Sequence, residues 1–370
     1  MGLRCGIVGL PNVGKSTIFN ALSNAKAEAA NFPFCTIEPN IGVITVPDER
    51  LDILSELVHP EKVLPTVIEF VDIAGLVKGA STGEGLGNKF LANIREVDAI
   101  VHVIRCFEDV NITHVAGSID PGFDKEVIDT ELQLKDLESI EKKISRIEKM
   151  AKSGDAMAKK ELEVALTYKE HLSSGENART ISLSGQERNL MADLKLLTAK
   201  PVIYVANVDE ESILSDNQFV IALKESADQE FQLDGQAPRV VTLCGAIESQ
   251  IAELEVEERQ LFLEEYGLKE SGLSKLIKAS YKLLDLITYF TAGPKEVRAW
   301  TIRNGWRAPQ AAGAIHTDFE KGFIKAEVIK LKDYRHYGTE LACKEAGKIA
   351  IEGKEYVVED GDIIHFRFNV

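Results

Sequence analysis

The segment GLPNVGKST, residues 9–17, has residue types and a spacing that suit phosphate binding. It matches the pattern GxxxxGK[ST] and lies between an apolar run and the helix-like run IFNAL, as that motif requires. Glycine lets the loop wrap closely around a phosphate, and the loop amides together with the helix N-terminus attract the anion. A chance glycine-rich turn is the alternative, and it leaves the flanking elements unexplained. The predicted nucleotide-binding residues of this segment are Asn12, Val13, Gly14, Lys15, Ser16 and Thr17.

Three further positions indicate magnesium and a γ-phosphate. The run FVDIAG ends in Asp-x-x-Gly, in which Asp72 is expected to hold Mg²⁺ through water and the Gly75 amide to contact the γ-phosphate. Alone this pattern also fits ordinary turns, but after a phosphate loop it is specific. The Ser16 hydroxyl and Thr36, in the irregular segment NFPFCT, are predicted to complete the Mg²⁺ coordination. A threonine that merely precedes a strand is the alternative for Thr36.

The stretch NVDE stands where a GTP-binding switch protein carries Asn-Lys-x-Asp. Guanine presents two donors on one edge, which the final aspartate of that motif accepts. Adenine presents one amino donor beside a bare acceptor, and a buried mismatch of polar groups costs about 1–3 kcal/mol. Asn207 can span N7 and the 6-amino group of adenine. Val208 offers apolar contact, and Glu210 is too long to replace the aspartate unchanged. We therefore predict ATP over GTP; the alternative is that Asp209 shifts by one place and reads guanine.

Hydrolysis needs a group that positions water in line with the γ-phosphate. Lys15 is predicted to stabilise the phosphates during the reaction, whereas Leu76, directly after Asp-x-x-Gly, cannot orient water. His114, in a predicted loop after the fourth strand, is the candidate group, because imidazole exchanges protons near neutral pH. A solvated loop histidine is the alternative. Asn12 occupies a position suited to holding K⁺ beside the phosphates, or it is purely structural.

The elements that must position these residues form an α/β sheet domain. Six short apolar runs recur with helical stretches between most of them, which favours parallel strands covered by helices. The runs at residues 41–46 and 67–73 are expected to pair antiparallel. The predicted strands are CGIVGL (5–10), IGVITV (41–46), VIEFVDI (67–73), AIVHVI (99–104), PVIYVAN (201–207) and RVVTLC (239–244).

A helical arm is predicted between the fourth and fifth strands, because residues 105–200 are too many for one crossover helix. Apolar residues recur at alternating spacings of three and four, which is typical of a coiled coil, and SGD at 153–155 can turn the chain. An ordinary pair of surface helices is the alternative. The predicted seam residues are Leu137, Ile140, Ile144, Ile147 and Ala151, facing Leu162, Ala165 or Leu166, and Leu172.

The C-terminal segment changes character after the helical stretch 272–286 and the run TAGP. Strand-like runs at 297–302, 323–331, 356–360 and 363–370, with a short helix at 308–316, predict a small α+β module. Basic and aromatic side chains interleave there, which suits RNA contact, although a solvated charged face is the commoner outcome. These side chains are Lys295, Arg298, Arg303, Trp306, Arg307, Lys321 and Lys325.

Composition limits the remaining possibilities. The net charge of −16 argues against a generally basic, nucleic-acid-coating protein, although basic and acidic residues balance from Asp285 onward. The five cysteines are scattered without CxxC spacing, so neither disulfides nor a zinc site is predicted. No apolar run approaches the roughly 18 residues that a membrane span needs, and no leader segment is recognised. We expect a cytoplasmic protein.

In this order the motifs resemble those of the Obg group of P-loop NTPases, and in detail those of the YchF-type Obg-like ATPases, also called ribosome-binding ATPases. The resemblance spans essentially the entire chain. Its segments are NFPFCTIEPN, DIAGLVKGAS, GEGLGN, NVDE, KEVRAWTI, APQAAGAIHTDFEKGFIKAEV and DGDIIHFRFNV. It implies a Ras-like P-loop NTPase domain at 1–284, an inserted antiparallel coiled-coil arm at 124–200, and a β-grasp (TGS) domain at 285–370.

The resemblance also implies function. It implies a preference for ATP and a catalytic role for His114. It places the last base-contacting loop at Cys244-Gly245-Ala246. The partner that it implies is the ribosome, either the 70S particle or its 50S subunit, with RNA contact through the TGS domain and the arm. We predict an Mg²⁺-dependent ATPase that acts as a nucleotide-controlled switch, and K⁺ is a second candidate cofactor, which the sequence alone does not decide. The alternatives are a GTP-dependent switch and a nucleotide-gated adaptor with little turnover.

Overall fold

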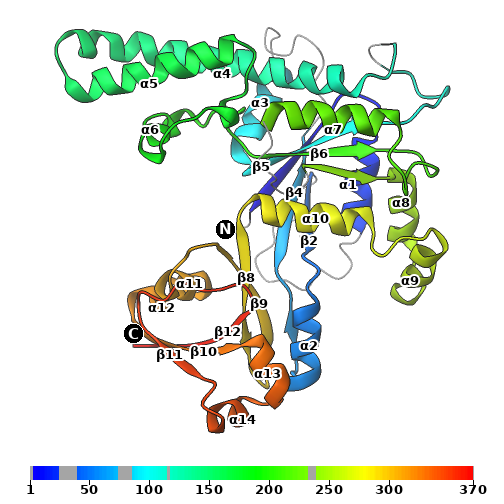
Figure 1. Cartoon of the computed structure of the whole chain (residues 1–370), viewed down its shortest axis with the longest axis vertical. Coiled ribbons are helices and arrows are strands. Elements are labelled where there is room, and N and C mark those ends of the chain that lie inside the picture. Colours follow the sequence, from blue (N-terminus) through cyan, green and yellow to red (C-terminus); the bar gives the residue numbers. More distant parts are fainter. Residues whose placement is uncertain (1–2, 25–39, 74–85, 115–116, 232–238, 370) are drawn as a thin grey trace. The chain divides into compact units, whose positions relative to one another are not determined.

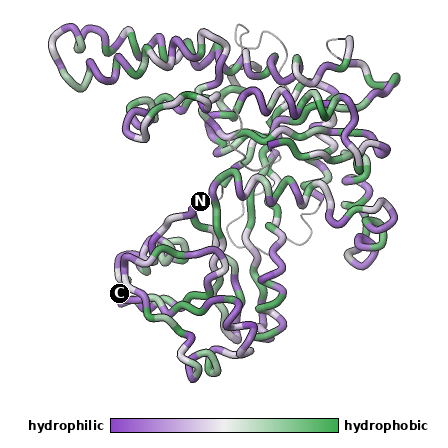
Figure 2. The backbone as a smooth tube through the Cα atoms, viewed as in Figure 1, coloured by the Kyte–Doolittle hydropathy of each residue, from purple (hydrophilic) through white to green (hydrophobic). Residues whose placement is uncertain are grey.

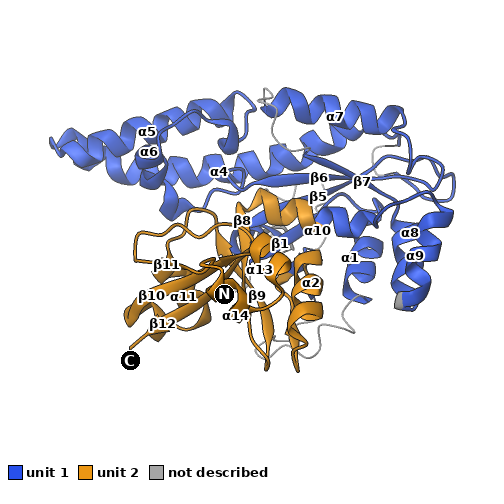
Figure 3. Cartoon of the chain, turned by 60° about the horizontal axis from the view of Figure 1, so that its bottom comes forward, with its two compact units in different colours: residues 1–44, 69–276 blue, residues 45–68, 277–370 orange. Residues whose placement is uncertain are grey.

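The computed structural model describes residues 3–24, 40–73, 86–114, 117–231 and 239–369 (Figure 1). The chain divides into two compact units, one of residues 1–44 and 69–276 and the other of residues 45–68 and 277–370 (Figure 3). Residues 45–68 therefore pack with the C-terminal segment. The sequence-based domain boundary between residues 284 and 285 stays a prediction.

The first unit is built on a sheet in the order β2-β4-β1-β5-β6-β7, in which β4, β1, β5, β6 and β7 are parallel. Strands β5 and β6 are buried along their whole length, because helices cover both faces. The strands are β1 Arg4–Val8, β2 Ile41–Thr45, β4 Val67–Asp72, β5 Ala99–Arg105, β6 Val202–Asn207 and β7 Val240–Leu243. All six predicted strands are thus confirmed. Figure 2 shows the apolar residues gathered along them.

The predicted antiparallel pairing of β2 with β4 is also confirmed. The Asp72 amide donates to the Asn40 carbonyl beside one end of β2, and the Val46 amide donates to the Thr66 carbonyl beside its other end. Partner numbers therefore fall along one strand as they rise along the other, which defines antiparallel strands. The first unit holds the helices α1 Lys15–Asn24, α3 Leu86–Glu96, α7 Gln218–Phe231, α8 Gly245–Glu253 and α9 Val256–Glu265, and α10 Gly272–Leu283 carries the chain into the second unit.

The predicted arm is a helical hairpin of α4 Pro121–Lys152 and α5 Ala156–Ser173, which lie side by side (Figure 1). Asp155 caps α5 by accepting from the amides of Met157 and Ala158, and Gly154 takes a positive φ of 101° in the turn. Leu166 faces solvent while Ala165 is fully buried, which resolves the alternative at that position. Short helical turns then lead back to the sheet: η2 Ala178–Thr180, α6 Gly185–Leu190 and η3 Ala192–Leu194.

The arm's apolar seam forms a core of its own. Its members include residues of the returning segment and the predicted residues of both helices except Ala151, which is buried but lies outside this cluster, so residues 178–196 cover part of the hairpin. This packing explains why a long helix with many charged residues remains ordered, since an amphipathic face rather than propensity supplies most helical stability. The buried and half-buried seam residues are Leu137, Ile140, Ile144, Ile147, Leu162, Ala165 and Leu172.

The second unit contains a sheet in the order β11-β10-β12-β8-β9-β3, which α11 packs against. Strand β3, Val63–Leu64, joins this sheet from far away in the sequence. The remaining strands are β8 Leu286–Ala292, β9 Val297–Arg303, β10 Phe323–Lys330, β11 Ala350–Glu352 and β12 Asp362–Phe368. The helices are α2 Glu49–Val58, α11 Ala308–Ile315, α12 Thr317–Lys321, α13 Leu331–Tyr337 and α14 Glu340–Glu345.

Two expectations for this unit are wrong. Residues 356–360 do not form a strand, because only Val357 makes an isolated bridge, and the segment turns so that Tyr356 Oη and the Glu359 amide both donate to Asp362. The helical stretch ends at Leu283 rather than 286, since Asp285 adopts a positive φ of 52°. Strand β8 follows directly, and the apolar run LITYFTA was not recognised as a strand.

Cys5, Cys106, Cys244 and Cys343 are all buried, as small apolar fillers should be. No helix in the described part of the chain has the length and apolar character to cross a membrane.

Candidate nucleotide-binding site

A cavity of about 850 Å³ lies at the carboxyl ends of the parallel strands of the first unit. Its walls come from the phosphate loop, from residues 107–112 after β5, from residues 207–210 after β6, and from residues 244–246 after β7. Ligands of open parallel sheets bind at this edge. The structure therefore brings together four segments that the sequence analysis had treated separately.

The phosphate loop has the backbone conformation that its glycine predicts. Gly14 has a φ of 90°, and an added Cβ there would lie 2.2 Å from Asn207 Nδ2. Both the conformation and the space therefore require glycine. Asn12 also takes a positive φ, of 64°, and its side-chain amide donates to the Thr113 carbonyl at 3.2 Å. Helix α1 begins directly after this turn at Lys15.

Lys15 and Asp72 meet at the phosphate end of the cavity. Lys15 Nζ lies 2.6 Å from Asp72 Oδ1, and both side chains are largely shielded from solvent. The predicted phosphate-binding cation and the predicted magnesium-binding carboxylate are thus adjacent. Ser16, whose hydroxyl is the other described magnesium candidate, also lines the cavity. Thr36 and Gly75, two further predicted contacts, fall outside the described residues.

The side-chain oxygen atoms of Ser16 and Asp72 are suitable ligands for a hard cation such as Mg²⁺. In proteins this ion usually retains several water ligands and binds only one or two protein oxygens. Such an ion would neutralise phosphate charge. Within the described ranges there is no cluster of three or more His, Cys, Asp and Glu residues that could bind a metal alone.

Asn207, at the end of β6, connects two walls of the cavity. Its Nδ2 donates to the Val13 carbonyl at 2.9 Å, and its Oδ1 accepts from the Gly245 amide at 2.9 Å. The residue is buried, so both bonds hold the phosphate loop and the turn before α8 in fixed positions. A carboxamide has two hydrogens and two lone pairs, which leaves one of each for a base. The sequence predicted a base-reading role for Asn207 and gave no sign of these two bonds, which connect the phosphate loop to the turn before α8.

The other base-end residues also line the cavity. Val208 is buried, and Asp209 and Glu210 follow it at the wall. Asp209 Oδ1 accepts from the Ser212 amide at 2.9 Å, so this carboxylate already caps a local turn. That engagement weighs against the alternative in which Asp209 reads guanine. Residues 244–246 complete the wall, as expected.

The loop after β5 is held by a residue that sequence reasoning missed. Arg105, the last residue of β5, is almost fully buried and donates to the carbonyls of Phe107, Asp109 and Ile112 at 3.0, 3.2 and 2.9 Å. The guanidinium group has five N–H donors in a fixed planar arrangement, so one arginine can bind several backbone carbonyls of the same loop. The one available signal was a charged residue at the end of the largely apolar run AIVHVIR.

His114 does not line the nucleotide cavity; its side chain faces α4. Nε2 of His114 lies 2.9 Å from Oδ2 of Asp124, in the first turn of α4, and both side chains are nearly inaccessible. The burial of Asp124 raises the pKa of its carboxyl, and the hydrogen bond with His114 acts in the opposite direction. The alternative reading of a solvated loop histidine is wrong.

A buried ionic network joins the arm to the sheet. Glu230, on α7, accepts from Arg179 Nε at 2.7 Å and from Tyr204 Oη at 2.6 Å, and its Oε2 lies 2.9 Å from Lys125 Nζ. Asp129 pairs with both cations. Although burial alone would raise the pKa of Glu230, the charges of Arg179 and Lys125 lower it to about 2. Spacing gave no sign of this network, because its members come from four separate elements.

The basic and aromatic residues of the C-terminal unit are partly engaged with one another. The Arg298 guanidinium lies 3.9 Å from the centre of the Trp300 ring, Lys325 pairs with Glu327, and Arg307 pairs with Glu355. These contacts fit the solvated charged face as well as they fit RNA binding.

The comparison with known proteins decides the family. The ribosome-binding ATPase YchF of Bacillus subtilis is 56% identical over 372 residues, and that of Haemophilus ducreyi is 57% identical over 370, each alignment covering 100% of both chains. The chain belongs to the YchF family. The solved YchF GTPase of Schizosaccharomyces pombe, 41% identical, matches with a TM-score of 0.89 over 99% of this chain and 98% of that one. The predicted family and the α/β fold class are therefore confirmed.

Two family models match separate parts of the chain. A model described as a 50S ribosome-binding GTPase matches residues 4–153, and the YchF GTPase C-terminal domain, described as a protein of unknown function, matches residues 286–369. The YchF relatives thus carry both ATPase and GTPase in their names, which makes the choice of base the central question for this chain.

Proposed function

We propose that this protein is an Mg²⁺-dependent ATPase that acts as a nucleotide-controlled switch on the ribosome. The observation that carries the proposal is the cavity itself, in which Lys15 stands at the phosphate end and Asn207, Val208 and Glu210 at the base end. The names of the bacterial relatives, ribosome-binding ATPases, support the same function.

Adenine is the better base for this cavity. The Nδ2 hydrogen and the Oδ1 lone pair that remain on Asn207 match N7 and the 6-amino group of adenine. Asp209 is occupied by its own turn, and no lysine follows Asn207 to cover a guanine. Competition between ATP and GTP for the full-length chain tests this directly. We expect ATP to bind tighter; GTP binding about ten times tighter than ATP, a difference of about 1.4 kcal/mol, would contradict the base assignment.

Phosphoryl transfer to water is expected to depend on charge and position more than on covalent chemistry. Lys15 balances phosphate charge, and Mg²⁺ held by Ser16, Thr36 and Asp72 supplies the remaining positive charge when bound. His114 is the proposed group that orients or deprotonates the attacking water. We expect His114→Ala to leave ATP affinity unchanged and to lower turnover by about tenfold or more. Unchanged turnover would remove His114 from the mechanism.

The potassium proposal rests on Asn12. Its strained backbone and its bond to Thr113 hold its side chain at the phosphate loop, where a monovalent cation could replace the charge of an arginine finger. Exchange of K⁺ for Na⁺ should then slow hydrolysis. Equal rates in both salts would assign Asn12 a structural role alone.

The ribosome is the proposed partner, with the 50S subunit or the whole 70S particle bound through the arm and the C-terminal domain, and the protein acting in the cytoplasm. Turnover should rise when 70S or 50S particles are added and remain unchanged with 30S particles. A nucleotide-gated adaptor is the second candidate, because His114 lies away from the cavity and implies slow intrinsic hydrolysis. Single-turnover kinetics with and without ribosomes separates these two functions.

A further inference from the structure

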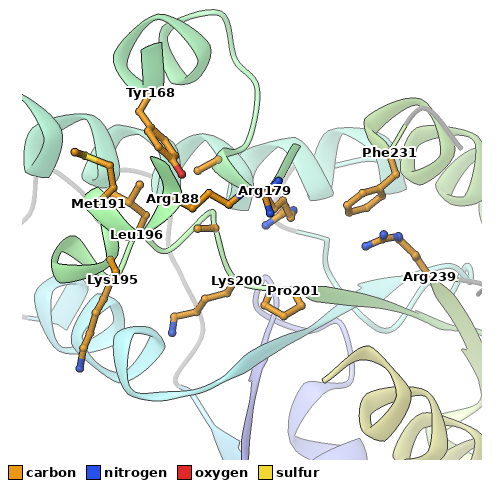
Figure 4. Close-up of a pocket in the computed structure, with 13 residues that line it drawn as sticks. Tyr168, Arg179, Arg188, Met191, Lys195, Leu196, Lys200, Pro201, Phe231 and Arg239 are labelled. Carbon is orange, nitrogen blue, oxygen red and sulfur yellow. The ribbon is translucent and has the colours of Figure 1, made fainter. Parts of the chain in front are cut away.

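A second cavity, of about 490 Å³, lies in the first unit, and the described residues that line it are all different from those that line the nucleotide cavity (Figure 4). Tyr168 of α5 projects into it from the arm, and Pro201 stands at the start of β6 on its opposite wall. Because Pro201 precedes β6 while Asn207 ends it, the two cavities lie at opposite ends of the same strand. Its size is within the usual range of small-molecule sites.

The charge of this cavity is one-sided. Among the lining residues that the structure describes, five side chains are cationic and none is acidic, in a chain whose net charge is −16. A cavity lined by charges of one sign concentrates the electrostatic field and attracts ions of the opposite sign. The cationic residues are Arg179, Arg188, Lys195, Lys200 and Arg239.

The basic side chains that line the cavity differ in their contacts with the rest of the protein. Arg179 is neutralised by the buried carboxylates behind it, and Lys200 Nζ donates to the backbone carbonyls of Arg95 and Val97. Burial lowers the pKa of Lys200, and the nearby charge of Lys195 lowers it further. Burial likewise lowers the pKa of Arg239, with Arg179 adding to the effect. Burial is the main cause of both lowered pKa values, since the carboxylates of Asp98 and Glu230 act in the opposite direction on Lys200 and Arg239, respectively.

Apolar and aromatic groups form the rest of the wall. The Arg239 guanidinium lies 3.5 Å from the centre of the Phe231 ring, and the Tyr168 ring faces the space from α5 (Figure 4). Met191 and Leu196 add apolar surface. A flat ring can stack on such a surface while its phosphate meets the cations, since arginine and aromatic planes both stack on bases.

We propose that this cavity binds a small phosphate-bearing molecule with a flat ring, of the mononucleotide class. Arg188 and Arg239 meet the phosphate, and Phe231 lies beside the ring. The site is separate from the ATP-binding cavity, so its occupancy does not depend on the function proposed above.

Equilibrium dialysis of the full-length chain with radiolabelled AMP tests the proposal. The experiment uses the Lys15→Ala variant, which weakens phosphate binding in the first cavity and leaves the second intact. We expect saturable binding, which weakens by about tenfold or more in Arg188→Glu, because the charge reversal replaces an attraction by a repulsion. The matched control is Lys149→Glu/Lys159→Glu, two exposed lysines of the arm, which should leave AMP binding unchanged.

Two further ligands, inorganic phosphate and a short single-stranded RNA, test whether the cavity prefers a mononucleotide to other phosphate-bearing molecules. Inorganic phosphate should bind more weakly than AMP, because it lacks the ring, and a short single-stranded RNA should not compete with AMP. No saturable binding, equal binding of phosphate and AMP, or binding of the RNA alone would overturn the proposal. Loss of binding in the control variant would overturn it as well. Phe231→Ala gives a second readout, since it should weaken AMP and leave inorganic phosphate unchanged.

Discussion

His114 and Asp124 join the loop after β5 to the first turn of the arm. Their side chains lie 2.9 Å apart, Nε2 to Oδ2, with exposures of only 6% and 1%. The same loop is bonded to Asn12 of the phosphate loop through Thr113. A movement of the first turn of α4 would therefore be transmitted to the proposed catalytic histidine through the His114–Asp124 contact. It would be transmitted to the phosphate loop through the bond between Asn12 and Thr113.

Asp124→Asn should raise the basal rate of ATP hydrolysis. His114 must leave Asp124 to reach the cavity, and a neutral partner holds it less strongly than a carboxylate by about 1 kcal/mol. The released population, and with it the turnover, should rise by roughly fivefold. Steady-state kinetics measures the effect. Asp120→Asn is the matched control, because asparagine caps a helix as well as aspartate does and the His114–Asp124 pair remains. A fall in turnover would mean that Asp124 orients the histidine for catalysis.

Asp72→Asn should weaken the dependence of hydrolysis on magnesium. The variant keeps the shape of the side chain but removes the charge that lies 2.6 Å from Lys15 and that is proposed to hold the ion. We expect the Mg²⁺ concentration for half-maximal turnover to rise by about tenfold, as for the loss of one charged ligand or its support. Glu69→Gln, on the same strand but paired with Arg4, should leave the magnesium dependence unchanged. Equal magnesium requirements in both variants would remove Asp72 from the ion site.

The double substitution Val208→Lys/Glu210→Asp should shift the cavity toward GTP. It restores the guanine-reading pattern behind Asn207, which keeps its bonds to Val13 and Gly245. The ratio of ATP to GTP affinity should fall by about tenfold or more, since one mismatched buried polar pair costs about 1–3 kcal/mol. Glu211→Asp, a shortening of the exposed neighbour outside the cavity, should leave the ratio unchanged. A ratio that stays constant in the double variant would show that these positions do not read the base.

The sequence was most informative where local patterns determine structure. The six strands of the first sheet, the phosphate loop and the arm hairpin follow from apolar periodicity, glycine placement and turn residues, which act over a few positions. It was least informative where distant segments meet. The pairing of Val63 with Val297 places β3 in the C-terminal sheet, and no local pattern around residues 63–64 indicates a partner more than two hundred residues away.

The same distinction holds for the site. Residue types predicted Lys15, Ser16, Asp72 and Asn207, and the structure places all four in or beside one cavity. The bracing bonds of Asn207 and the orientation of His114 toward α4 depend on long-range packing, so motif matching alone could not find them. The buried network around Glu230 was missed for that reason too.

Glu230→Gln should destabilise the protein, and the effect should depend on pH. At pH 7 the variant leaves Lys125 and Arg179 with Asp129 as their shared carboxylate, and breaking a buried pair costs about 3–5 kcal/mol in the free energy of unfolding. The pKa of Glu230 is lowered from its ordinary 4.5 to about 2, so its contribution is complete above pH 4.5 and is lost as the pH falls toward 2. The difference in the free energy of unfolding between wild type and variant should therefore shrink over that interval.

Urea unfolding at a series of pH values measures this difference. The control is Glu163→Gln, at an exposed position of α5, whose free energy of unfolding should stay within about 0.5 kcal/mol of wild type. A difference that stays constant from pH 7 to 2 would show that the charge of Glu230 does not stabilise the network.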